Sequence, residues 1–343
     1  MTECPMPRRR TIFKELPFDV VENPHAHRLT MPDLEAVFVG PKRYVQSDRY
    51  KEFGLDIYNF EARPDDVYLI GYLRSGTTLT CEIVWQIGND LDYEGAAKDF
   101  MDYRFPHIDV MGTLEVTRHI PKTKTLTEEM KEIIHKYQQL DLKGLSEREG
   151  RRFIKSHLAL SLMPPHIFEV GAKVIYCARH PRDVIVSLYE VSSFFRPNGP
   201  QAEFKDMLED FINDAGWNCP YFEHVKEAWE RRNDANFLFL FYEDTIKDKR
   251  QTIRKVAQFL GKSLSENQVD SLEDYLSLEK FKNNKSVNCD QLVKLGVAKD
   301  TNRFIRKGKS EGWRQYFDAE MKEKFDKWME KNLQDTDLRF PEK

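Results

Sequence analysis

An apolar run that ends in a glycine-bounded loop, followed at once by a helix, restricts this chain to few folds. Val67 to Gly71 follows the turn Arg63-Pro64-Asp65-Asp66, and residues 77–88 carry apolar side chains at helical spacing. This pattern predicts a buried strand, a loop and a helix. Further strands are expected over 152–155, 172–178 and 236–242, with helices from Pro181 and from about 247 to 260, where Gly261 stops the second one.

Strands that alternate with helices predict an α/β fold with a central parallel sheet flanked by helices. Such a sheet binds its ligand at the carboxyl ends of its strands. We expect a single domain over 1–343, with an N-terminal arm over 1–35. Two stretches break the alternation: 102–150 is polar with one helical pattern near 127–140, and 279–317 is basic and irregular. A stretch of this kind is often a lid or binding loop, and we expect 102–150 to be a lid or insertion over the binding site.

Charge and composition exclude several classes of partner. Lys and Arg total 53 against 57 Asp and Glu, which gives a net charge of -4. Nucleic acid and anionic membrane are therefore poor candidates, and a polyanion would need a local pocket. The five cysteines are scattered, without Cys/His metal spacing, so neither a disulfide framework nor a zinc site is expected. Without a secretory signal or an apolar run of ~18 residues, we expect a cytoplasmic protein that has no membrane contact.

The loop between the first strand and its helix is typical of phosphate binding. It runs from Gly71 to Thr78 and resembles the nucleotide loop G-x-x-x-x-G-K-[ST], but Thr77 replaces the lysine and the cation is Arg74. The N–H groups of such a loop and of the helix N-terminus still form an anion cradle. The missing lysine argues against an ordinary metal-dependent NTPase or small-molecule kinase. A Gly/Ser/Thr turn without a ligand is the alternative, and the flanking strand and helix weigh against it.

Two further cationic sites follow in the sequence. Arg179 ends a predicted strand and Ser187 follows two helical turns later, an arrangement that suits a second phosphate group. Arg306 and Lys307 precede Gly308, where the backbone can approach a ligand closely. Taken alone, residues of these types are more often solvated surface or, for the serine, a helix cap. Together the three predict a nucleotide with two separated phosphate-type groups.

These motifs resemble those of the cytosolic sulfotransferases that use 3'-phosphoadenylyl sulfate (PAPS), and most closely the insect members with their retinol dehydratase branch. The resemblance runs from about residue 35 to the C-terminus. Its motifs are the loop 73–78, the segment 153–158 around His157, the stretch 179–187, Phe241 to Asp244, 280–284, and 304–313.

The resemblance implies roles for the matching residues. His157 would be the general base, with Lys155 and Arg74 beside the transferring group. The residues implied to hold PAPS, or its product adenosine 3',5'-bisphosphate (PAP), are Arg74, Ser75, Gly76, Thr77, Thr78, Leu79, Arg179, Ser187, Tyr242, Ser277, Leu278, Arg306, Lys307 and Gly308. No metal is implied, because side-chain cations would offset the modest charge of a sulfuryl group.

Three departures from the family pattern affect the roles that the resemblance implies. Arg74 stands where most members have lysine, and Leu79 and Leu278 replace the Trp and Phe that hold adenine. A homodimer is implied by the motif K-x-x-x-T-V-x-x-x-E, but Asp318-Ala319 occupies its Thr-Val centre here. That dimer is therefore in doubt.

The expected reaction is in-line transfer of a sulfuryl group to the hydroxyl of a small, largely apolar acceptor such as a phenol, a steroid or a retinoid-like alcohol. Aromatic side chains would suit such a pocket, and ordinary core packing explains each of them equally well: Phe100, Tyr103, Phe105, Phe194 and Phe195. An alternative is dehydration, in which a sulfated allylic alcohol loses sulfate. A non-catalytic nucleotide-binding module is a further alternative, although both Lys155 and His157 are present.

Overall fold

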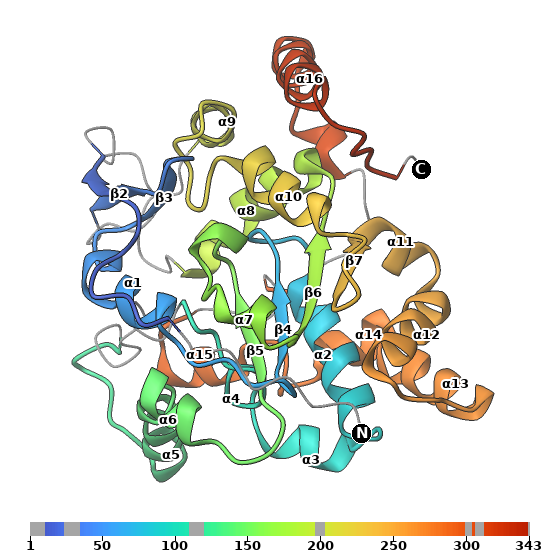
Figure 1. The fold of residues 1–343 in the computed structure, drawn as a ribbon. Coiled ribbons are helices and arrows are strands. Elements are labelled where there is room, and N and C mark those ends of the chain that lie inside the picture. Colours follow the sequence, from blue (N-terminus) through green and yellow to red (C-terminus); the bar gives the residue numbers. More distant parts are fainter. Residues whose placement is uncertain are drawn as a thin grey trace, which may run out of the picture.

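A four-stranded parallel sheet forms the centre of the molecule (Figure 1). The computed structural model describes residues 11–23, 35–109, 120–195, 203–298, 304–305 and 312–341. The strand order is β5-β4-β6-β7, so β4 lies inside the sheet and β5 lies at one edge. The strands are β4 (Val67–Ile70), β5 (Phe153–Ser156), β6 (Lys173–Ala178) and β7 (Phe237–Phe241). All three pairings are parallel, which confirms the sheet predicted from the alternation of strands and helices.

The sheet is buried on both faces because its strands are apolar at nearly every position. Alternate residues of a strand point to opposite faces. Tyr68 and Ile154 belong to one buried cluster, whereas Leu69 and Phe153 belong to another on the opposite face. The second cluster is completed by α2 (Thr77–Gly88), α12 (Lys249–Leu260) and α13 (Glu266–Tyr275), among other elements.

Helix boundaries agree with the local sequence signals. The helix α8 (Pro181–Phe195) begins at a proline, whose missing N–H is not needed in a first turn. The helix α12 ends at Gly261 in the left-handed conformation, with φ +71°. The remaining helices near the sheet are η3 (Leu160–Leu162), α7 (His166–Glu169), α9 (Phe204–Ile212), α10 (Tyr221–Glu230), α11 (Tyr242–Lys247) and α16 (Ala319–Leu333).

The N-terminal residues form a second sheet that was not predicted from the sequence. The strands β1 (Val20–Glu22), β2 (Ala36–Val39) and β3 (Tyr44–Ser47) pair antiparallel, and α1 (Tyr50–Tyr58) follows. In Figure 1 they lie on the opposite side of the central sheet from α11 to α13. Each strand has only three or four residues, too few for an alternation of apolar and polar side chains to be recognised.

The two stretches outside the alternation contain more helix than predicted. The pattern near 127–140 is confirmed as α5 (Glu128–Gln138), and α3 (Tyr93–Lys98), α4 (Met101–Arg104) and α6 (Leu142–Glu147) lie around it in the sequence. The irregular stretch 279–317 was wrongly predicted, since it contains α14 (Leu278–Asn283), α15 (Asp290–Leu295) and η5 (Gly312–Gln315). Helices of four to six residues carry too little apolar periodicity to be found from sequence.

Candidate active site

The loop between β4 and α2 curls tightly enough to bring its backbone together. Arg74 adopts φ +63° and Gly76 φ +94°, and the Ser75 N–H donates to the Tyr72 carbonyl at 3.2 Å. The α2 helix starts directly after Gly76, so its first N–H groups face away from the helix without intrahelical partners. Ser75 is fully buried, yet its hydroxyl has no hydrogen-bond partner in the described part of the chain. An unpaired buried hydroxyl beside a helix N-terminus fits an anionic phosphate or sulfate group.

Gly76 is required by the close approach of an aromatic ring. A Cβ atom added there would lie 2.2 Å from Cδ2 of Tyr242, the first residue of α11. Arg179 also lies over the tyrosine ring, with its guanidinium carbon 4.6 Å from the ring centroid. The loop, the tyrosine and the arginine therefore form one packed unit, which supports the predicted contribution of Tyr242 and Gly76 to donor binding.

Arginine side chains join the predicted loop to the predicted second phosphate site. Arg179 donates to the Arg74 carbonyl at 3.1 Å, while its own Nε is buried and has no hydrogen-bond partner among the residues that the structure describes. Arg74 donates through Nε to the Ser187 hydroxyl at 3.0 Å and through its guanidinium to the Phe304 carbonyl at 2.9 Å. The structure thus brings Arg74, Ser187 and Arg179 together, as the sequence predicted. Arg306, Lys307 and Gly308 lie outside the described residues.

The residues expected around adenine are less closely gathered. Leu79 is partly buried and packs against the cluster on the α2 face. Leu278, the first residue of α14, is 41% exposed, and Ser277 is the N-cap of that helix. Thr77 is buried and Thr78 half-buried in the first turn of α2.

His157 is held in one tautomer by the first residue of the loop. It follows β5 directly, is 7% exposed, and its Nδ1 lies 2.6 Å from the Gly71 carbonyl. A carbonyl only accepts, so Nδ1 carries the proton and Nε2 keeps its lone pair. Burial and the nearby Lys155 hold the pKa of His157 well below 6.5, so the imidazole is neutral at pH 7. A neutral imidazole with a free Nε2 can accept a proton.

A shell of polar groups fixes the backbone of His157. Its N–H donates to Asp109 Oδ2 at 3.0 Å, and its carbonyl accepts from His224 Nε2 at 3.0 Å and from the Asn218 amide. His224 Nδ1 in turn lies 2.7 Å from the Tyr176 hydroxyl. These contacts come from two turns, from α10 and from β6, and they leave the histidine backbone little freedom.

Lys155 lies two residues before His157 on β5 and is 6% exposed. Alternation along the strand puts both side chains on the same face of the sheet. Its charge helps to lower the pKa values of His157 and His107 and opposes the burial-driven rise in the pKa of Asp102. A buried ammonium beside a neutral imidazole suits the stabilisation of a developing anion.

The five aromatic residues proposed for an acceptor pocket separate into two groups. Phe100, Tyr103 and Phe194 belong to or pack against a cluster formed with α5 and α15. Phe105 instead belongs to the cluster on the α2 face, where its ring lies 5.6 Å from that of Phe153. It therefore serves as core below the site. The Phe195 side chain lies outside the described residues.

A separate surface groove of about 380 Å³ is lined by α3, α13 and α14 and contains none of the predicted site residues.

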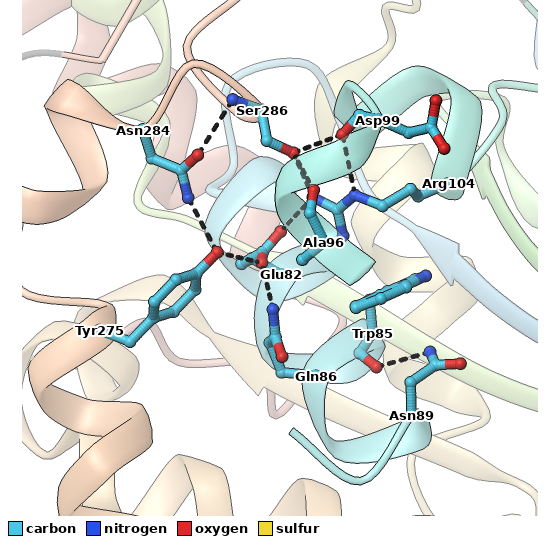
Figure 2. A network of polar contacts seen from close by, with 10 residues as sticks. All are labelled: Glu82, Trp85, Gln86, Asn89, Ala96, Asp99, Arg104, Tyr275, Asn284 and Ser286. Atoms are coloured by element: carbon cyan, nitrogen blue, oxygen red, sulfur yellow. Dashed lines mark hydrogen bonds and ion pairs between the residues drawn. The ribbon is translucent and has the colours of Figure 1, made fainter. Parts of the chain in front are cut away.

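A buried ionic network secures the helix that follows the donor loop (Figure 2). Glu82 of α2 is fully buried and accepts from Arg104 at 2.7 Å, from the Tyr275 hydroxyl at 2.9 Å and from Gln86 at 2.8 Å. Arg104 also donates to the Ser286 hydroxyl at 2.9 Å. The network joins α2 to α4 and to the ends of α13 and α14, so the donor helix and the stretch that begins at 102 share one rigid support.

Sequence reasoning missed His107 and Asp109. Both side chains lie beside His157: the two histidine rings are 4.9 Å apart between centroids, and Asp109 binds the His157 N–H. The only signal was the alternation of polar and apolar residues in His107-Ile108-Asp109 after Pro106. A three-residue segment is too short to predict as a strand edge.

Known proteins share this fold and these motifs. A family model described as "Sulfotransferase domain" matches residues 64–337. Luciferin sulfotransferase of Photinus pyralis is 34% identical over 305 residues, covering 87% of this chain and 80% of that protein. Sulfotransferase 1E1 of Bos taurus is 32% identical over 294 residues, covering 85% of this chain and 92% of that protein. The crystal structure of retinol dehydratase in a complex with retinol and PAP is 40% identical with a TM-score of 0.86, covering 95% of this chain and 99% of that one.

The chain belongs to the sulfotransferase family, which confirms the resemblance seen in its motifs. It is an enzyme of the PAPS-dependent type, and solved relatives carry PAP. Among the described residues, none of the helices is long and apolar enough to span a membrane.

Proposed function

We propose that this enzyme transfers a sulfuryl group from PAPS to the hydroxyl of a small, largely apolar alcohol, with His157 as general base and no divalent ion. One observation carries the proposal: the first residue of the donor loop, Gly71, holds His157 Nδ1 at 2.6 Å. The loop and the proton acceptor are therefore built as one unit. Bound PAPS supplies the activated sulfuryl group, and the cytoplasm is where we expect the reaction.

The donor would lie along the loop and the two arginines. Ser75, with its unpaired hydroxyl, and the N–H groups at the start of α2 would bind the 5'-phosphosulfate. Arg179, whose Nε is also unpaired, would bind the 3'-phosphate together with Ser187 and the motif 306–308. Buried Lys155 and Arg74 would offset the charge that develops on the leaving phosphate.

The test is transfer of radiolabelled sulfate from PAPS to a panel of a phenol, a sterol and retinol, with EDTA present. We expect at least one acceptor to be sulfated. His157→Ala should reduce turnover by at least about 100-fold while PAP still binds. Turnover close to the wild type in that variant would contradict the general base, and transfer that needs added Mg²⁺ would contradict the metal-free mechanism.

A second candidate outcome is dehydration of an allylic alcohol. The observation that favours it is the similarity to retinol dehydratase, at 40% identity over nearly the whole of both chains. Sulfuryl transfer is proposed first because it must precede any loss of sulfate.

A further inference from the structure

The segment 106–108 extends the central sheet by one short bridge at the β5 edge. The Lys155 N–H donates to the Pro106 carbonyl at 2.8 Å, the Ile108 N–H donates to the Lys155 carbonyl at 2.9 Å, and His107 pairs with Lys155 in parallel. Paired residues and their neighbours two positions away share a face. His107 therefore lies on the same face as Lys155, at the carboxyl end of β5, and the turn that follows brings Asp109 to the His157 N–H.

Asp109 connects the two histidines. Its Oδ2 accepts from the His157 N–H at 3.0 Å, and its Oδ1 lies 3.8 Å from His107 Nδ1. Both Oδ1 and Nδ1 are buried without a hydrogen-bond partner within the described ranges. A carboxylate that faces Nδ1 favours the tautomer with a proton there and leaves Nε2 as a proton acceptor. Burial, Lys155 and His157 hold the pKa of His107 well below 6.5, so it is neutral at pH 7.

Sulfuryl transfer uses one proton acceptor, and His157 is protonated once it has taken the proton of the acceptor hydroxyl. Loss of sulfate from an allylic sulfate ester needs a second proton acceptor. In that step the C–O bond breaks and sulfate leaves with its electron pair. A C–H bond on the carbon attached to the far end of the allylic C=C bond supplies the electrons for the new C=C bond. The existing double bond shifts to the carbon that loses sulfate, and the proton must be accepted. The products are a hydrocarbon with one more double bond, sulfate and a protonated base.

On the basis of the proposed function, we propose that His107, oriented by Asp109, is the second proton acceptor of the acceptor site and gives this enzyme a sulfate-eliminating activity on allylic alcohols. The two neutral imidazoles, 4.9 Å apart, would act in sequence: His157 on the hydroxyl and His107 on the C–H bond. Protonated His157 and Lys155 would offset the charge of the departing sulfate.

The test uses the full chain, radiolabelled PAPS and all-trans-retinol, and measures PAP, the sulfate ester and the dehydrated hydrocarbon separately. We expect the wild type to form hydrocarbon. His107→Gln should lower the ratio of hydrocarbon to PAP by at least about tenfold, with the ester accumulating, since a positioned base contributes about 10²–10⁴ in rate. Asp109→Asn should lower the same ratio. The matched control is His166→Gln on α7, a histidine outside the site, which should leave the ratio unchanged.

An unchanged ratio in His107→Gln would overturn the inference, as would a wild type that forms only the sulfate ester. In both cases PAP formation would still support the proposed function. If no acceptor of the panel yields PAP, the proposed function itself fails. Calorimetry with PAP confirms that each variant is folded, and His107→Phe provides a second replacement that cannot accept a proton should the glutamine variant fail to fold.

Discussion

Replacing Gly76 by alanine tests whether the donor loop and Tyr242 form one binding unit. The added Cβ would lie 2.2 Å from one ring carbon of Tyr242 and 2.9 Å from another, so the ring must move. The backbone there has φ +94°, which costs a non-glycine residue about 1–2 kcal/mol. Moving the ring also removes the contact with Arg179 at 4.6 Å, worth about 0.5–1 kcal/mol for an exposed pair and more when desolvated.

Gly171 provides the matched control, because its φ is +72° and a Cβ there would meet nothing within 4 Å. Gly171→Ala therefore carries the backbone strain without the collision. Since about 1.4 kcal/mol corresponds to tenfold in affinity, we expect Gly76→Ala to weaken PAP binding by at least about tenfold in calorimetry, whereas Gly171→Ala should bind like the wild type. Equal PAP affinity in the two variants would refute the view that the ring and loop act together.

Three further outcomes are expected. Arg179→Ala should weaken binding of PAP far more than binding of its analogue without the 3'-phosphate, measured by calorimetry; equal losses would argue against the 3'-phosphate role. Because burial lowers the pKa of His157 from 6.5, kcat/KM at pH 6 should stay within twofold of its value at pH 7.5, whereas an ordinary imidazole would lose about fourfold. Asp66→Asn breaks a fully buried ion pair with Arg152 at 2.6 Å and should lower the free energy of unfolding, measured with urea, by about 3–5 kcal/mol. The control Asp234→Asn removes an exposed carboxylate and should lower it by about 0–1 kcal/mol. Equal losses in the two variants would contradict the burial argument.

The central sheet could be predicted because its strands are buried on both faces. Val67 to Ile70 and Val174 to Ala178 are continuous apolar runs that end in loops, and this signal needs no tertiary information. The antiparallel strands near the N-terminus depend on pairing between short segments such as Ala36–Val39 and Tyr44–Ser47. Pairing of this kind is a tertiary event that leaves little local pattern.

The donor loop was predictable for a similar reason: its glycines, hydroxyls and cation are contiguous in the sequence. The environment of His157 could not be predicted. Asp109 lies 48 positions before it and His224 lies 67 positions after it, and only the folded sheet brings them together. The altered dimer motif has a local explanation. Asp318 caps the start of α16 by accepting from the Met321 N–H at 2.8 Å. That local role accounts for the aspartate at this position.

The most direct test of the account is the binding of PAP to the purified chain in EDTA, measured by titration calorimetry. On the proposed function, Ser75, the start of α2, Arg74 and Arg179 would provide the anion cradle from the protein alone, so we expect saturable binding of PAP that added Mg²⁺ does not strengthen. Heat of binding seen only with ATP and Mg²⁺, and none with PAP, would contradict the account.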